Sequence, residues 1–187
     1  MPFIRYFSIL VLIYVLSVYS VFGQAETFPF LAEIQAERVN IRAGENENFE
    51  KIGQLIKGNQ VIVVFKRYHW YKIELPLIAK SYVSEKYIQL IDDKNGVITT
   101  SKVNVRCGPT INNSILGQLD KGAKVSILGK EDKFYKIIPM PGSFGWIDEK
   151  YVAFKSKDIS GYQSLKPVEA VSSSAIDARQ SVDTISK

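Results

Sequence analysis

The sequence is organised by a strict alternation of apolar and polar residues, which is clearest at positions 39–42. Val39 and Ile41 alternate there with Asn40 and Arg42, so the apolar side chains share one face of a strand and the polar ones the other. Further runs rich in β-branched and aromatic residues lie at 60–65, 70–73, 82–83 and 88–91. Short strands at this spacing, separated by turn-forming residues, predict a small all-β barrel.

The whole pattern occurs twice. The run Val39-Asn40-Ile41-Arg42-Ala43-Gly44 returns 64 positions later as Val103-Asn104-Val105-Arg106-Cys107-Gly108. Without any gap, 18 of the 50 positions from Val39 to Ile88 are identical at this offset. A period this long, present only twice, indicates two tandem domains rather than a stacked array of short repeats.

The repeat sets the expected domain organisation. We predict a first domain at 26–91, a polar linker at 92–96 and a second domain at 97–155, each a barrel of five to six strands. Residues 156–187 lose the alternation and are rich in Ser, Lys, Asp and Ala, which predicts a largely disordered tail, with a weak helix at 168–185 as the alternative. The predicted first core comprises Val39, Ile41, Leu55, Val61, Val63, Tyr71, Ile73 and Val83. The second comprises the residues 64 positions later.

The repeated residues resemble the bacterial SH3-like domain family. The shared features are Val-Asn-Ile/Val-Arg-x-Gly, then Gly-x-Leu-x-x-Gly-x-x-Val, then an aromatic residue before Tyr-Lys-Ile. The second copy also has Arg106-Cys107-Gly108-Pro109 and Gly145-Trp146-Ile147, similar to that family's Arg-x-Gly-Pro and Gly-Trp-Val signatures, whereas the first copy has Glu45 and Lys80-Ser81-Tyr82-Val83 at these places. The resemblance implies two tandem SH3-like barrels and a place among exported, cell-wall-associated proteins.

The N-terminal residues 1–25 predict a secretory signal peptide. Arg5 precedes an uncharged apolar run from Tyr6 to Phe22, and small residues follow at Gly23 and Ala25. The run of about 17 residues is at the lower limit for spanning a bilayer, so an uncleaved membrane anchor remains the alternative. Either interpretation places the domains outside the cytoplasm, in the periplasm, at the cell surface or secreted.

Charge and metal-ligand residues exclude several classes of function. The net charge of +5 is modest, and basic and acidic residues are evenly mixed in both copies, so we expect no nucleic-acid partner. A single His and a single Cys cannot form a zinc site, and the acidic loop at 45–48 lacks the calcium-loop pattern. We therefore expect no metal and no cofactor.

The best candidate for catalysis is the pair Cys107 and His69, the only cysteine and the only histidine. A nucleophile and a base need mutual hydrogen-bond contact and a third group that orients the base. At the 64-residue offset Cys107 replaces Ala43, and His69 corresponds to Lys133, so each is a variable position. We therefore expect no catalytic residue and no enzymatic activity.

The candidate ligand-binding residues are four aromatics that lie out of phase with the core or at a hairpin. They are Trp146 and Phe134 in the second copy, and Trp70 and Tyr82 in the first. Flat aromatic faces suit sugars or extended peptides, although large side chains also close the ends of small barrels. Because Gly145 precedes Trp146, we expect the second copy to keep the more family-like groove and to dominate binding.

These observations predict an exported, non-enzymatic protein that binds peptidoglycan or an envelope protein. The alternative is a structural or accessory subunit of a membrane-associated complex, anchored by an uncleaved N-terminal segment. A secreted hydrolase that uses Cys107 is a third, less favoured hypothesis.

Overall fold

The computed structural model describes residues 26–164, whose regular elements are fourteen strands and two single-turn 3-10 helices. The first repeat contains β1 (Phe30–Ile34), β2 (Arg38–Arg42), β3 (Lys51–Ile56), β4 (Gln60–Arg67), β5 (Trp70–Glu74), β6 (Tyr82–Ser84), η2 (Glu85–Tyr87) and β7 (Ile88–Leu90). The second contains β8 (Asn95–Ile98), β9 (Val103–Arg106), β10 (Ile115–Leu119), β11 (Lys124–Glu131), β12 (Phe134–Ile137), β13 (Phe144–Asp148), η3 (Glu149–Tyr151) and β14 (Val152–Ser156). The all-β prediction is confirmed, and each Glu-Lys-Tyr segment forms a single 3-10 turn between two strands.

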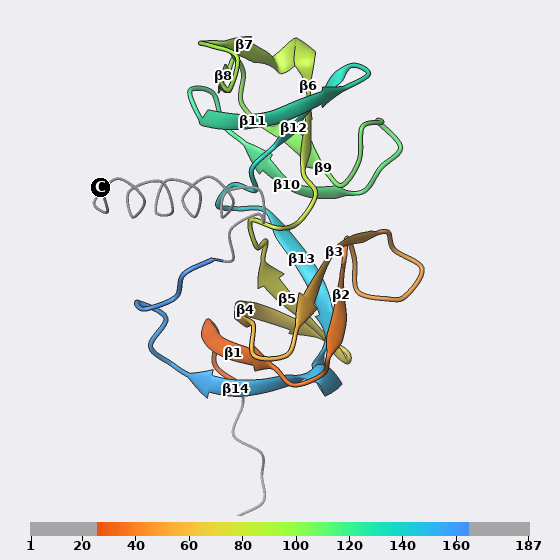
Figure 1. Cartoon of the computed structure of the whole chain (residues 1–187), viewed down its shortest axis with the longest axis vertical. Helices are drawn as coiled ribbons and strands as arrows, with labels where there is room; N and C mark the ends of the chain where they lie inside the picture. Colours follow the sequence, from red (N-terminus) through yellow and green to blue (C-terminus); the bar gives the residue numbers. More distant parts are fainter. Residues whose placement is uncertain (1–25, 165–187) are drawn as a thin grey trace, which may run out of the picture.

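The strands form two seven-stranded sheets that do not follow the repeats. The first sheet has the order β14-β1-β4-β5-β13-β2-β3, and the second has the order β10-β9-β6-β12-β11-β8-β7. We call them the first and second barrel. In the first barrel, β14 lies beside β1, and β13 lies between β5 and β2 (Figure 1). In the second barrel, β6 lies between β9 and β12, and β7 lies beside β8. Each repeat therefore gives its last strands to the other repeat's barrel. The prediction that 26–91 and 97–155 each form a barrel of their own is wrong.

Two connections carry this exchange, at residues 75–81 and 138–143. The sequence predicts them as the loops of hairpins that return to the same sheet, but each leads into the other barrel. Backbone hydrogen bonds hold them in place: Leu75 N donates to Ser143 O at 3.0 Å, and Ile137 N donates to Ser81 O at 2.9 Å.

The segment 92–96, predicted as the inter-domain linker, lies inside the second barrel. It forms the turn of the β7–β8 hairpin and the first two residues of β8, and in this hairpin Ile88 pairs with Ile98 and Leu90 with Gly96. Asp92 shapes the turn, since its Oδ1 accepts the backbone N–H of Lys94 at 2.8 Å. A polar run rich in Asp, Asn and Gly therefore marks a tight turn here rather than a domain boundary.

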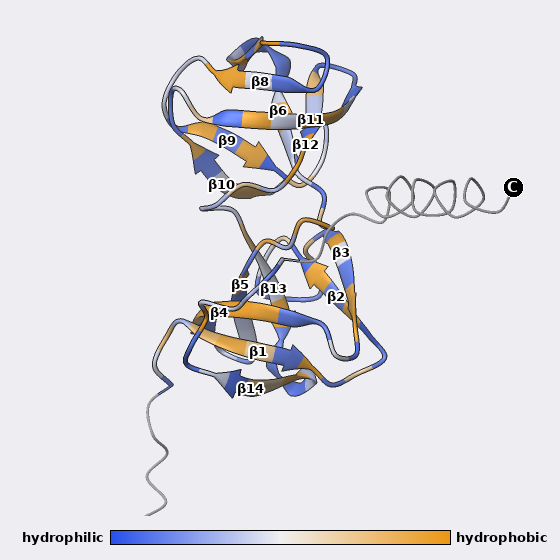
Figure 2. Ribbon diagram, turned by 60° about the vertical axis from the view of Figure 1, so that its left-hand side comes forward, coloured by the Kyte–Doolittle hydropathy of each residue, from blue (hydrophilic) through white to orange (hydrophobic). Residues whose placement is uncertain are grey.

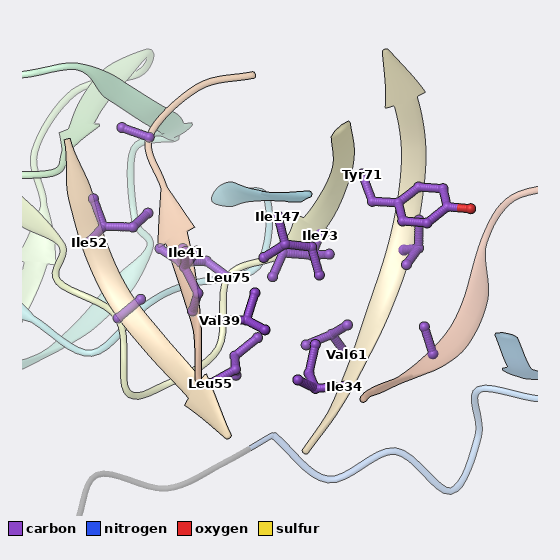
Figure 3. Close-up of a cluster of buried hydrophobic side chains, with 14 of the residues drawn as sticks. Ile34, Val39, Ile41, Ile52, Leu55, Val61, Tyr71, Ile73, Leu75 and Ile147 are labelled. Atoms are coloured by element: carbon purple, nitrogen blue, oxygen red, sulfur yellow. The ribbon is translucent and has the colours of Figure 1, made fainter. Parts of the chain in front are cut away.

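The predicted core positions are buried, apart from Tyr135, which is partly buried against the second cluster. Apolar and polar residues alternate along strands such as β9 (Figure 2), so one face of each strand packs inward. The partners differ from the prediction for the last strands: Ile147 packs in the first barrel and Val83 in the second. Figure 3 shows Ile147 beside Ile73, from the other repeat.

The two barrels contact each other through equivalent positions of the repeats. Glu50 and Ser114 are 64 residues apart, and Glu50 accepts the Ser114 backbone N–H at 3.1 Å and its hydroxyl at 2.7 Å. Two further pairs at this offset, Ala43 with Cys107 and Ile52 with Leu116, belong to the same apolar cluster. Such reciprocal contacts are typical of an interface with two-fold symmetry.

We expect the Glu50 contact to make the protein sensitive to acid. Burial alone would raise the pKa of the Glu50 carboxyl, but hydrogen bonds from Ser114 outweigh it and lower the pKa from 4.5 to about 2. The stabilisation is therefore complete above about pH 4.5 and is lost as the pH falls towards 2. Glu50→Gln should cost about 1 kcal/mol at neutral pH and flatten the loss of stability in urea unfolding between pH 5 and 2.5. Parallel pH profiles for the two proteins would contradict this role.

The ends of the chain are only partly described. The predicted signal peptide at 1–25 and residues 165–187 of the predicted disordered tail lie outside the described residues. Within the predicted tail, Ser156 ends β14, and Ser164 Oγ accepts the backbone N–H of Leu77 at 3.1 Å. No helix among residues 26–164 is long and apolar enough to cross a bilayer.

Candidate binding pockets of the two barrels

The strand exchange regroups the four candidate aromatics. Trp70 on β5 and Trp146 on β13 both belong to the first barrel, and Phe134 on β12 and Tyr82 on β6 both belong to the second. The expected pairing of Trp146 with Phe134 in one groove is therefore wrong. That expectation rested on Gly145 as part of a groove, but Gly145 packs in the core. A Cβ at this position would lie 2.6 Å from Ile41 Cγ2.

The second barrel carries a pocket of about 450 Å³ whose walls come from both repeats. The first repeat supplies Ser84 at the end of β6 and the η2 turn with Lys86 and Tyr87. The second repeat supplies β9, Ile111 of the following loop and the start of β12 with Phe134. The pocket is therefore composite and depends on the exchange.

The first barrel has an equivalent but smaller pocket of about 110 Å³. The residues at equivalent places in the two pockets are Val39 and Val103, Asn40 and Asn104, Arg42 and Arg106, Trp70 and Phe134, and Tyr151 and Tyr87. Here β13 and η3 of the second repeat face strands of the first. The chain thus forms the same kind of pocket twice, each time from one wall per repeat.

The two pockets differ in charge. Among the described residues, Lys86, Lys102, Arg106 and Lys133 line the second-barrel pocket, and no acidic residue does. The first-barrel pocket is lined by two arginines, Arg38 and Arg42, and by two acids, Glu47 and Asp148. Asp148 also binds Lys150 at 2.8 Å, and this hydrogen bond raises the pKa of Lys150.

Only two of the four predicted residues line these pockets. Phe134 and Trp70 do so, whereas Tyr82 and Trp146 line neither. Tyr82 is 4 % exposed and its hydroxyl donates to Glu131 at 2.9 Å; burial, aided by this bond, raises its pKa to about 12. Trp146 lies on β13 opposite Lys72 of β5 and Arg42 of β2.

Sequence reasoning missed the charged and loop residues of the pockets. Neither the lysines at 86, 102 and 133 nor Ile111 is among the four residues predicted to bind a ligand. A comparison of the copies position by position contained the signal, since Ser84 replaces Asp148, and Ile111 replaces Glu47. These two changes remove both acids from the second pocket.

The cysteine and the histidine are held by different carboxylates. His69 Nδ1 lies 2.8 Å from Glu149 Oε1 at an exposed turn. Cys107 is 5 % exposed, and burial together with hydrogen bonding to Glu50 raises the pKa of its thiol to about 12. A thiol in this environment is not an activated nucleophile. Among residues 26–164 no three His, Cys, Asp or Glu side chains come together as metal ligands.

Comparisons with known proteins point to one family. The model of the bacterial SH3 domain matches residues 37–89 and 101–153, more than half of the chain. A curated protein from Bacillus subtilis (strain 168), the putative N-acetylmuramoyl-L-alanine amidase YrvJ, is 25% identical over 134 residues, which are 63% of this chain and 26% of that protein. The chain thus spans about a quarter of that relative's length.

Two solved structures show a weak likeness, NlpC2 and NlpC1 from Trichomonas vaginalis. The NlpC2 match has 15% identity, a TM-score of 0.23 and coverage of 70% of this chain and 50% of that chain. The NlpC1 match has 16% identity, a TM-score of 0.22 and coverage of 74% and 50%.

Proposed function

Because this chain belongs to the bacterial SH3 domain family, we propose that it is an exported binding protein that recognises peptidoglycan. Domains of this family are typical cell-wall binding modules. The amidase in the comparison is named for N-acetylmuramoyl-L-alanine, a linkage of peptidoglycan. The observation that carries the proposal is the pair of equivalent pockets, each lined by aromatic, amide and cationic side chains.

Binding without catalysis is part of the proposal. The reactive-residue pair that could serve a hydrolase is separated: Cys107 is buried with Glu50, and His69 contacts Glu149. A wall-degrading activity that is lost on Cys107→Ala would contradict this part. The search for such activity uses turbidity clearing of purified peptidoglycan.

Ile111 offers a direct test of the second-barrel pocket. It lines the pocket yet is 75 % exposed, so Ile111→Ser should leave the fold intact. If wall material covers this side chain, its loss should weaken binding by about 1 to 2 kcal/mol, or about 5- to 30-fold. Co-sedimentation of the protein with purified peptidoglycan over a concentration series measures the change.

Ile115 is the matched control. It is 50 % exposed, lies a few residues further along the chain at the start of β10, and does not line the pocket. Ile115→Ser should therefore bind as the unchanged protein does. Equal losses for both variants would assign the binding to another surface, and no retention of the unchanged protein would overturn the proposed function.

A second candidate function, an accessory subunit of an envelope complex, is favoured by one aromatic cluster. Phe28 stacks on Phe30 with ring centroids 5.6 Å apart and contacts Phe65 at 6.5 Å. Phe65 and Phe154 are about half exposed, and the cluster lies beside the N-terminal end of the described chain. Envelope crosslinking that captures a partner through Phe65, together with an uncleaved N-terminus in intact mass, would favour this function over wall binding.

A further inference from the structure

The second-barrel pocket has cationic walls, and no carboxylate of residues 26–164 lines it. Lys86, Lys102, Arg106 and Lys133 all line it. Within residues 26–164 none of these four side chains takes part in an ion pair. Arg106 is fixed in place, because its Nη1 donates to Asn113 O at 2.8 Å.

The first-barrel pocket provides an internal comparison. The same elements surround both pockets, so the substituted side chains are the main difference. Lys150 is neutralised by Asp148, whereas its counterpart Lys86 has Ser84 at the place of that acid. Likewise, Ile111 replaces Glu47. In the first-barrel pocket, Glu47 and Asp148 offset the charges of Arg38 and Arg42 and would repel a carboxylate ligand. No acid among the described residues that line the second-barrel pocket does so, and its cations are available to a carboxylate of a ligand.

We propose, resting on the proposed binding of peptidoglycan, that the second-barrel pocket binds a short wall peptide through its free carboxylates, and that the first-barrel pocket does not. Val103, Ile111 and Phe134 give the pocket apolar surface for the aliphatic parts of such a peptide. The four cations, which come from both repeats, contact the carboxylates between those parts.

The surroundings favour discrete carboxylates over a polyanion. A nucleic acid or a phosphate polymer needs a continuous basic track. Here Glu85 precedes Lys86 and is engaged by Lys130 at 2.5 Å, and Glu131 and Asp132 precede Lys133. Acidic residues therefore interrupt the basic surface on both sides of the pocket.

The experiment titrates the protein with four probes under identical conditions. The first is the tripeptide L-alanyl-γ-D-glutamyl-L-lysine with free carboxylates, and the second is its fully amidated form. The third is neutral chitotetraose, and the fourth is glycerol 3-phosphate, which tests phosphate as the source of the anion. Calorimetry gives the affinities, and amide chemical shifts of the second-barrel and first-barrel pockets locate the site.

We expect the free tripeptide to bind at the second-barrel pocket at least about tenfold more tightly than the amidated form. Raising NaCl from about 0.05 to about 0.5 M should weaken this binding, because exposed charges are screened. Equal affinity for the free and amidated forms would overturn the proposal, as would shifts confined to the first-barrel pocket. Tighter binding of glycerol 3-phosphate than of the tripeptide would overturn it too.

Two variants separate charge from folding. Ser84→Asp places in this pocket the acid that the first barrel has at Asp148. Asp148 is the N-cap of η3 and accepts the Lys150 N–H at 3.1 Å. An Asp at position 84 should cap η2 in the same way, without loss of stability. Lys102→Gly removes a cation from a residue with φ of 59°, a conformation that Gly adopts more readily. Each should weaken tripeptide binding about threefold to tenfold while thermal stability stays equal or rises. Unchanged affinity in both variants would overturn the role of these charges.

The matched control is Lys150→Gln, which alters the equivalent lysine of the other barrel and should not change tripeptide binding. The outcomes also separate the two proposals. If the protein binds purified peptidoglycan regardless of amidation, salt and Ser84→Asp, the carboxylate site fails and wall binding stands. If the free tripeptide binds at the second-barrel pocket but purified peptidoglycan does not retain the protein, the site stands and wall binding fails.

Discussion

Ile147→Ala is expected to destabilise the first barrel, although Ile147 belongs to the second repeat. Its side chain is 0 % exposed and packs with the cluster of the first barrel, where β13 pairs with β5 and places Ile147 opposite Tyr71. Truncating a fully buried isoleucine removes apolar contacts and leaves a cavity, at a cost of about 2 to 5 kcal/mol. Native-state amide hydrogen exchange should show the largest loss of protection in β2, β4 and β5.

Ile137→Ala is the matched control, because the same substitution falls only ten residues earlier in the same repeat. Ile137 is also 0 % exposed but packs in the second barrel. Its loss should therefore lower protection most in β9, β11 and β12. If Ile147→Ala instead affected those strands most, residues 144–148 would complete their own repeat, and the exchange would not exist in solution.

The strands and most of the core could be predicted from the sequence, because burial on a strand follows the period of two. The exchange could not. Val83 and Ile147 are equivalent positions, so either barrel offers each of them nearly the same buried place. A pattern of apolar residues decides which face of a strand is buried, and it does not decide which of two similar sheets receives the strand. The connections at 75–81 and 138–143 are short enough to be hairpin loops, which is why the sequence favoured that interpretation.

The binding pockets were harder to predict than the core for the same reason. Each pocket joins walls from two repeats. Its residues come together through the strand exchange, and no fixed spacing in the sequence marks them as neighbours. Trp70 and Phe134 were identified because an aromatic residue recurs at this position. The lysines of the second-barrel pocket, Lys86, Lys102 and Lys133, correspond to Lys150, Arg38 and His69 in the other copy. What distinguishes the second pocket is that no acid is among its described lining residues. That property becomes visible only when Ser84 and Ile111 are placed in one pocket.

Gly145→Ser is expected to destabilise the first barrel by about 1 to 3 kcal/mol, because it overfills a packed core. Gly145 is buried on β13, and a Cβ there would lie 2.6 Å from Ile41 Cγ2 and 3.2 Å from Leu75 Cδ1. The residues at the equivalent places of the second barrel are Ser81 and Val105. In the first barrel the smaller Gly145 accompanies the larger Ile41. In the second barrel the larger Ser81 takes the place of Gly145, and the smaller Val105 takes the place of Ile41. Urea unfolding followed by circular dichroism measures the cost.

This complementarity also favours the exchanged arrangement over the unexchanged one. Without exchange, Ser81 would meet Ile41 and be crowded, while Gly145 would meet Val105 and leave space unfilled. Ile41→Val, which supplies the second barrel's residue, should therefore recover part of the loss caused by Gly145→Ser, with a coupling of at least about 0.5 kcal/mol in a double-mutant cycle. Gly129→Ser, at a site where a Cβ meets nothing within 4 Å, should cost less than about 0.5 kcal/mol. Strictly additive costs for Gly145→Ser and Ile41→Val would show that the two positions do not select the strand that each barrel receives.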